Sequence, residues 1–240
     1  MSELRTMAVI PARGGSKGLP GKNLKLLAGK PLIAYSIEQA KASGVCDVVL
    51  VSTEDETIAR IAAEYGAEVP FRRPADLAGD AVPAEPVVLH ALNTYEALTG
   101  GRIDIVVYLQ PTDIFRTPEV IRECVNRLKQ HPEFDSVFAA YKTHKNYWRW
   151  TPDGYVRLAP ELATYRSRQE RGQFLYREDA GLASASRAAV IRAGRRIGDR
   201  VDLVITEDVR TAIDIHTAFD FWLAEKVITE WSAHEFVKGH

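Results

Sequence analysis

The sequence predicts an α/β protein in which helices cover both faces of a mostly parallel, doubly wound sheet, giving three layers. Short apolar runs alternate along the chain with segments of helical periodicity, which is the pattern of βαβ units. Residues 47–52 and 103–110 are almost continuously apolar, as strands are when both faces of their sheet are covered. A glycine-rich polar segment follows the first apolar run, where such sheets bind ligands.

The first half of the chain contains four predicted strands and three predicted helices. The strands are expected at residues 7–10, 47–52, 68–70 and 103–110, and the helices at 30–43, 54–65 and 86–98. Glycines directly after the helical patterns predict where those helices end. Thr117 and Pro118 then predict the N-cap and first turn of a fourth helix.

The second half continues the alternation after an irregular excursion. Strands are expected at residues 135–141, 181–186 and 201–205, and a final helix at 213–231. An apolar stripe on that helix is expected to face the core; it consists of Ile215, Phe219, Trp222, Leu223 and Val227. We find no repeat or linker, so residues 1–240 are predicted to form a single domain.

Composition excludes several classes of protein. The 240 residues carry a net charge of −1, so no overall field attracts nucleic acid or a membrane surface. Cys46 and Cys124 offer neither metal-site spacing nor a disulfide framework, and two reduced thiols are expected. No apolar run is long enough for a membrane span and no signal peptide is recognisable. We therefore expect a soluble cytoplasmic protein that binds neither nucleic acid nor membranes.

Residues 142–176 interrupt the alternation and are rich in aromatic and arginine side chains. The aromatic residues are Tyr147, Trp148, Trp150, Tyr155, Tyr165, Phe174 and Tyr176, and the arginines are Arg149, Arg157, Arg166, Arg168 and Arg171. Interleaved basic and aromatic residues occur in single-stranded nucleic-acid sites, but the near-neutral chain disfavours that function. Aromatic and arginine residues are also enriched in subunit interfaces. We therefore expect this segment to be a dimerisation arm.

The glycine-rich segment after the first strand has the composition of a polyphosphate-binding loop. Residues 13–23 contain four glycines, a serine, and the cations Arg13, Lys17 and Lys22. Glycines let backbone amides approach an anion closely, and cations add charge-assisted hydrogen bonds to phosphate oxygens. The segment is neither a Walker A loop nor a dinucleotide-binding fingerprint. A purely structural turn is the alternative.

The string from Pro11 to Asn23, Pro-Ala-Arg-Gly-Gly-Ser-Lys-Gly-Leu-Pro-Gly-Lys-Asn, resembles the nucleotide-binding signature of the acylneuraminate cytidylyltransferases, the CMP-sialate synthetases. The resemblance implies a nucleotide-diphospho-sugar transferase type of fold. It also implies that Arg13 and Lys22 contact the triphosphate of CTP and act in catalysis. Further nucleotide-binding residues are implied at Ala12, Gly14, Gly15, Ser16 and Asn23.

Three further motifs extend this resemblance. Arg73, followed by Pro74, matches a family arginine that lies against the cytosine base. Gln110, in Leu-Gln-Pro-Thr, matches a glutamine that hydrogen-bonds the sugar. Arg177 corresponds loosely to an arginine that pairs with the sugar carboxylate, although Glu178 and Asp179 replace the usual Pro-Asn. Those two acids are expected either to meet polar groups of a modified sugar or to form a salt bridge at the rim.

Asp214 and His216 occupy the place of the two carboxylates that bind magnesium in the family. Asp214 suits Mg²⁺, whereas an imidazole suits Mn²⁺, Zn²⁺ or Ni²⁺ better. His216 is therefore expected either as a metal ligand or as a neutral histidine beside the metal. Asp113 replaces a serine of the family motif and is either a further metal ligand or the cap of the next helix.

Together these motifs imply a cytidylyltransferase that activates a 2-keto-3-deoxy sugar acid with CTP, releases pyrophosphate and uses Mg²⁺, with Mn²⁺ as the alternative ion. The family also implies a homodimer. A cytidylyltransferase for a different acid acceptor and a non-catalytic nucleotide-binding relative are the alternatives. A glycosyltransferase is disfavoured, because the expected mid-chain Asp-x-Asp pair is missing.

Overall fold

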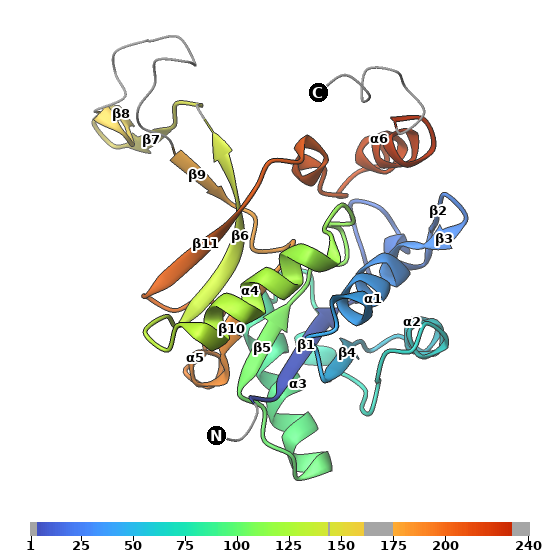
Figure 1. Ribbon diagram of the computed structural model, residues 1–240. Helices are drawn as coiled ribbons and strands as arrows, with labels where there is room; N and C mark the ends of the chain where they lie inside the picture. The colour runs from blue at the N-terminus through green and yellow to red at the C-terminus, as the bar shows by residue number, and fades with distance from the viewer. Residues whose placement is uncertain (1–3, 144, 161–174, 232–240) are drawn as a thin grey trace.

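A seven-stranded sheet forms the centre of the protein (Figure 1). The computed structural model describes residues 4–143, 145–160 and 175–231. Six strands follow the order β11-β6-β10-β5-β1-β4. The seventh, β9, pairs with the C-terminal part of β6, beyond the residues that pair with β10. The strands are β1 (Thr6–Pro11), β4 (Val48–Ser52), β5 (Ile105–Tyr108), β6 (Ser136–Thr143), β9 (Leu175–Glu178), β10 (Ser184–Arg187) and β11 (Val201–Thr206).

The sheet is mostly parallel, as predicted. β1 lies between β4 and β5 and runs parallel to both, with Val9 opposite Leu50 on one side and Tyr108 on the other. β6 and β11 are also parallel. β10 runs antiparallel between β5 and β6, and β9 runs antiparallel to β6, which the sequence pattern did not predict. The carboxyl ends of β1, β4 and β5 therefore lie side by side.

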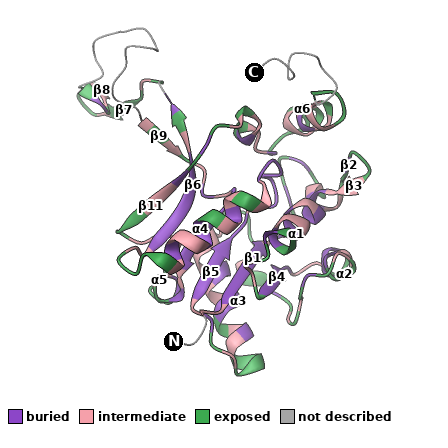
Figure 2. Ribbon diagram, in the orientation of Figure 1, coloured by how far each residue is buried: buried purple, intermediate pink, exposed green. Residues whose placement is uncertain are grey.

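Helices cover both faces of the sheet and complete the three predicted layers. On one face lie α1 (Leu32–Ser43), α2 (Glu56–Glu64) and α4 (Pro118–Gln130); on the other lie α3 (Ala84–Thr99) and α5 (Ala188–Arg192). Alternate residues of β1 divide between these faces, so Ala8 and Ile10 pack under α1 while Met7 and Val9 pack under α3. Figure 2 shows the buried strands between the half-exposed helices.

A third apolar cluster fixes segments that come from distant parts of the chain. It joins Leu19 of the glycine-rich segment, Ile114 and Phe115 after β5, and Ile215 near the end of the chain. Helix α6 (Ala218–Thr229) contributes the buried Ala224 to the same cluster. Burial of these side chains holds three polar segments at one edge of the sheet.

Several predicted boundaries were wrong. The predicted helix 30–43 begins only at Leu32, because β3 (Lys30–Pro31) pairs with β2 (Leu26–Leu27) as a short hairpin. No strand forms at 68–70, where Glu68 makes a single bridge to Leu50. Thr117 is the N-cap of α4, as predicted, although its side chain makes no capping hydrogen bond.

The final helix was predicted to begin five residues too early. The capping box between Thr217 and Asp220 starts α6 at Ala218, leaving residues 213–216 outside the helix. The predicted apolar stripe is only partly buried, because Phe219 is 65% and Trp222 is 52% exposed. The buried face of α6 instead centres on Ala224.

The two ends of the 142–176 arm belong to β6 and β9, and between them the arm forms a separate hairpin. β7 (Trp148–Thr151) pairs with β8 (Gly154–Arg157) and stands away from the main sheet in Figure 1. Arg157 lies over the ring of Trp148, 4.5 Å from its centroid. Tyr165, Arg166, Arg168, Arg171 and Phe174 lie outside the described residues. Within the described chain, no helix is both long and apolar enough to span a membrane.

Candidate functional site

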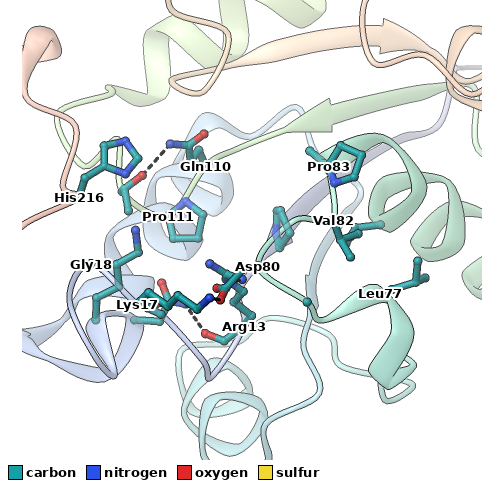
Figure 3. A pocket seen from close by; sticks show the side chains of 18 of the residues that line it. Arg13, Lys17, Gly18, Leu77, Asp80, Val82, Pro83, Gln110, Pro111 and His216 are labelled. Atoms are coloured by element: carbon teal, nitrogen blue, oxygen red, sulfur yellow. Dashed lines mark hydrogen bonds and ion pairs between the residues drawn. The ribbon is translucent and has the colours of Figure 1, made fainter.

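A cavity of about 600 Å³ opens where β1 and β5 end, as expected for a doubly wound sheet. Its lining combines the segment after β1, the residues before α3, the residues after β5 and the segment before α6 (Figure 3). Arg13, Lys22, Asn23, Arg73 and Gln110 all line it. The structure therefore brings together predicted site residues that lie almost 100 positions apart. We refer to this space as the nucleotide cavity.

Backbone hydrogen-bonding groups of the glycine-rich segment are held by three neighbours. The amide of Ala12 donates to the carbonyl of Ser52 at 3.0 Å, which continues the pairing of β1 with β4. The buried Asn23 donates through Nδ2 to the carbonyl of Arg13 at 2.9 Å. Gly14 donates its amide to Oε1 of Glu54 at 2.7 Å. The segment is thus shaped before any ligand binds.

Two glycines of this segment are required by close packing. A Cβ at Gly14 would lie 2.6 Å from Oδ2 of Asp55, and one at Gly18 would lie 2.5 Å from the carbonyl oxygen of His216. Gly18 therefore lets the loop approach the segment before α6. A Cβ at Gly15 would meet nothing within 4 Å, while Ser16 is buried and lines the cavity.

Two cations of the loop converge on one carboxylate. Arg13 lies 2.5 Å and the exposed Lys17 lies 2.7 Å from the two oxygens of Asp80 (Figure 3). Both interactions lower the pKa of Asp80, with the hydrogen bond from Lys17 the largest cause. Asp80 was not singled out from the sequence. Its carboxylate shows where these cations would hold an anionic group of a ligand.

Lys22 extends from the other end of the loop toward the segment before α6. Its Nζ donates to the carbonyl of Ile215 at 3.1 Å. Burial lowers the pKa of the ammonium group, and the nearby Asp214 opposes that shift. Arg13 also lowers the pKa of Lys22, because the two cations repel each other. A polyphosphate between them would remove this repulsion.

Arg73 is buried beside the loop and is oriented by Glu54. Its NH2 group donates to Oε2 of Glu54 at 2.7 Å, while Oε1 of the same carboxylate receives the amide of Gly14. Glu54 therefore connects the predicted base-binding arginine to the glycine-rich loop. Glu54 lies just after the strand predicted at residues 47–52, which was the available signal that it could belong to the site, but no sequence motif marked it.

Gln110 stands at the boundary between the nucleotide cavity and a second cavity of about 370 Å³. Its Nε2 donates to Oγ1 of Thr112 at 2.8 Å and lies 3.3 Å from both carboxylate oxygens of Asp214. The hydroxyl of Tyr108 lies 3.4 Å from its Oε1. We call the second space the acceptor cavity. It is also lined by Asp113, Arg177, Glu178, Asp179, Arg196 and Asp214.

Asp113 and Asp214 form a pair of like charges in the acceptor cavity. Burial, and after it the charge of Asp214, raises the pKa of Asp113 to about 7. Asp214 in turn lies 2.6 Å from Nε2 of His216. Asp113 does not cap α4, because Thr117 occupies that position. The helix-cap alternative for Asp113 was therefore wrong.

These groups fit a divalent cation that takes most of its ligands from water and phosphate. The charge of Asp214 raises the pKa of Asp113, and a bound cation would relieve the repulsion between the two carboxylates. Among the described residues, no cluster of three His, Cys, Asp or Glu side chains could hold a metal. His216 contacts Asp214 directly, which suits an imidazole that orients a carboxylate ligand. Mg²⁺ with retained waters matches this donor set better than Zn²⁺.

Arg177 lines the acceptor cavity as predicted, but its guanidinium is already paired. Nε and NH2 donate to the two oxygens of Asp179 at 2.6 and 2.8 Å. This bidentate hydrogen bond raises the pKa of Arg177. Asp179 therefore forms a salt bridge with Arg177, which was one of the two alternatives expected for the acids at positions 178 and 179.

The sequence also gave no role to Arg116, which is fully buried. Its guanidinium donates to Ser36 Oγ at 2.6 Å, to the carbonyl of Gly181 at 2.8 Å and to the carbonyls of Gln110 and Leu182. Burial lowers its pKa to about 10, so it stays charged at neutral pH. Arg116 fixes the backbone on which Gln110 stands.

Comparison with known proteins shows which proteins the chain resembles. Residues 7–188 match the family model described as Cytidylyltransferase. The chain is 35% identical over 226 residues to CMP-N,N'-diacetyllegionaminic acid synthase of Legionella pneumophila, covering 94% of this chain and 97% of that protein. It is 31% identical over 221 residues to N-acylneuraminate cytidylyltransferase of Escherichia coli, covering 92% of this chain and 51% of the longer relative.

A solved structure has the same fold. It is that of CMP:2-keto-3-deoxy-manno-octonic acid synthetase complexed with CTP, with a TM-score of 0.69 at 16% identity, covering 95% of this chain and 99% of the other. The likeness confirms the predicted three-layer α/β fold.

Arg13→Ala and Lys22→Ala are each expected to weaken CTP binding by about 1–3 kcal/mol, because each removes a charge-assisted contact to phosphate. Lys25→Ala is the control, since Lys25 is an exposed cation just beyond the loop. Isothermal titration calorimetry checks the affinities and thermal unfolding checks the fold. Unchanged affinity in either folded variant would contradict the assignment.

Asp113→Asn is expected to change how stability depends on pH in metal-free protein. Because the folded-state pKa of Asp113 is raised to about 7, its contribution to stability is complete at low pH and is lost as the pH rises through 7. The asparagine variant should therefore gain about 1–4 kcal/mol relative to the parent between pH 4 and pH 8. Urea unfolding at several pH values measures this, with Asp153→Asn on the exposed hairpin turn as control. A pH-independent difference would disprove the raised pKa.

Proposed function

Because this chain belongs to the cytidylyltransferase family, we propose that it transfers the cytidylyl group of CTP to a 2-keto-3-deoxy sugar acid of the sialic acid type. The names of the similar proteins support this acceptor class, since they include synthases of a CMP-legionaminic acid and of a CMP-acylneuraminate. The products would be the CMP-sugar and pyrophosphate.

The observation that carries the proposal is that the two cavities meet at Gln110. Cations of the glycine-rich loop lie on one side, and a carboxylate-lined acceptor cavity with two arginines lies on the other. A nucleoside triphosphate and a sugar acid bound in these spaces would have their reacting groups at the boundary. Transfer between two bound substrates needs this arrangement.

In the proposed reaction, the anomeric hydroxyl oxygen of the sugar acid attacks the α-phosphorus of CTP. A new phosphorus–oxygen bond forms, the bond from the α-phosphorus to the bridging oxygen breaks, and pyrophosphate leaves with that bridging oxygen. The hydroxyl proton is released. Arg13 and Lys22 offset the negative charge that develops on the phosphates. Gln110 orients the sugar at the boundary, and Arg73 with Asn23 positions the nucleotide.

We propose Mg²⁺ as the cofactor, held by Asp214 and Asp113 together with water and phosphate oxygens. When bound, this ion would neutralise triphosphate charge. Asp113 and Asp214 lie in the cavity next to the phosphate-binding cations, which supports the assignment. His216 orients Asp214 through the 2.6 Å contact. We expect the reaction to occur in the cytoplasm, and the two unpaired cysteines are consistent with a reducing compartment.

We also propose that the protein acts as a homodimer through the 142–176 arm. The described part of this arm exposes large apolar side chains, among them Trp150 at 66%, Tyr155 at 72% and Trp148 at 53%. Exposed aromatic residues gathered on one hairpin are typical of an interface. Tyr176, on the strand that carries Arg177, is also exposed. A partner on this surface would therefore lie beside the acceptor cavity.

A pyrophosphate-release screen tests the reaction. CTP should support release with at least one nonulosonic acid, such as N-acetylneuraminate or N,N'-diacetyllegionaminate, and UTP, ATP and GTP should not. The panel also includes shorter 2-keto-3-deoxy acids, because Glu178 and Asp179 distinguish this acceptor cavity. Release with a shorter acid alone would favour the alternative acceptor. No release with any acid would favour the non-catalytic alternative.

Asp214→Asn is expected to lower kcat/KM at least about 100-fold, because the metal–triphosphate complex would lose one of its carboxylate ligands. His216→Asp should lower the Mg²⁺ concentration needed for half-maximal activity, because it adds a carboxylate next to Asp214. Titration of Mg²⁺ and Mn²⁺ against the parent and both variants measures this. A parent enzyme that prefers Mn²⁺, with the preference lost in His216→Asp, would instead make His216 a direct ligand. Full activity of Asp214→Asn would rule out this metal site.

Replacement of Trp148 and Trp150 by Ser is expected to convert a dimer into a monomer, because it removes apolar surface from the interface. Analytical ultracentrifugation at micromolar concentration measures the change. Trp222→Ser on α6 is the matched control, since Trp222 is equally exposed but lies outside the arm. A parent protein that sediments as a monomer would refute the dimer.

A further inference from the structure

The acceptor cavity contains two arginines that differ in what they already bind. Arg177 and Arg196 both line this cavity. Arg177 uses Nε and NH2 for the bidentate pair with Asp179, so its fork is occupied. The arginine expected from the sequence to receive the sugar carboxylate is therefore neutralised by its own neighbour.

Arg196 has no comparable partner. Its closest carboxylate contacts are Glu85 at 3.6 Å and Glu178 at 3.8 Å, both longer than a hydrogen bond. The Nε atom of Arg196 is buried without a hydrogen-bond partner. The Arg196 side chain is 21% exposed, but its Nε, which faces Glu85 at 3.6 Å, is removed from water without a hydrogen bond in return, and such a donor is costly. Of the two arginines that line this cavity, Arg196 is thus the one that no carboxylate holds by a hydrogen bond.

The position of Arg196 is nevertheless fixed. Its carbonyl accepts a hydrogen bond from Ser186 Oγ at 2.6 Å, and Ser186 is buried in β10. Its guanidinium lies over the ring of Tyr108, 4.6 Å from the centroid. Tyr108 reaches Gln110 through its hydroxyl. Arg196 is therefore held beside the residue at which the two cavities meet.

The charge of the acceptor cavity makes such a cation necessary. Asp113, Glu178, Asp179 and Asp214 all line it, so an anionic sugar acid would enter an acidic space. Asp179 neutralises the charge of Arg177, and a metal cation bound by Asp113 and Asp214 would neutralise part of the remaining negative charge. A planar guanidinium matches a carboxylate in a bidentate pair.

We propose that Arg196 receives the carboxylate of the acceptor and thereby selects acids over neutral sugars, while the Arg177–Asp179 pair meets the sugar's polar groups. This inference rests on the proposed function and adds the residue that determines acceptor specificity. It also reverses the assignment of the carboxylate to Arg177.

The test compares each acid with its methyl ester, which keeps the reacting hydroxyl but removes the carboxylate charge. In the presence of CTP, kcat and KM are measured for N-acetylneuraminate or N,N'-diacetyllegionaminate and for the ester. Arg196→Gln is expected to raise KM for the acid about 10- to 100-fold and to leave the ester unaffected, so the preference for acid disappears. Arg177→Gln should raise KM for the acid and for the ester alike. Arg195→Gln is the matched control, because Arg195 is a surface residue paired with Asp199.

Arg196→Lys covers the case in which the glutamine variant does not fold. It keeps the charge but loses the planar fork, so KM for the acid should rise about 3- to 10-fold with the ester unchanged. The inference is overturned if the Arg196 variants keep the parent's preference for acid, or if Arg177→Gln abolishes it instead. A parent enzyme that turns over no acid contradicts the proposed function itself, and the inference falls with it.

Discussion

The site depends on one buried guanidinium. Arg116 joins the end of β5, the chain before β10 and helix α1, by donating to Gln110, Gly181, Leu182 and Ser36. A buried charge is tolerated only when its donors are satisfied, so these backbone segments cannot separate without exposing or orphaning it. Because Gln110 stands on this backbone, the boundary between the two cavities is fixed by the same interaction. A glycine is required at position 181 beside it, because a Cβ there would overlap Oδ2 of Asp113.

The nucleotide side of the site is organised in the same way by a carboxylate. Glu54 holds the amide of Gly14 with one oxygen and Arg73 with the other, so the glycine-rich loop and Arg73 share one support. Asp80 meanwhile sits between Arg13 and Lys17, in contact with both. A triphosphate binding there must exchange with this carboxylate. Preorganised donors that need little rearrangement are what stabilise developing charge in a transferase.

Much of this could be predicted from local sequence. The apolar runs of β4 and β5 and the glycine-rich loop after β1 were sufficient to place the nucleotide cavity at the carboxyl edge, because parallel sheets bind ligands there. The direction of β10 was not predictable, since an apolar run does not indicate its pairing partner. The start of α6 was missed because the capping box at Thr217 and Asp220 was overlooked within an apolar pattern. Arg116 and Arg196 were missed because burial and hydrogen-bond satisfaction are properties of the packed chain.

A structure of the protein in complex with CTP and an unreactive acceptor analogue tests the central claim most directly, namely that two substrates meet at Gln110. The account predicts triphosphate between Arg13 and Lys22, with Asp80 displaced, cytosine next to Arg73, and the acceptor beyond Gln110 with its carboxylate at Arg196. Triphosphate bound away from the glycine-rich loop, or an acceptor outside the cavity lined by Asp113 and Asp214, would contradict it.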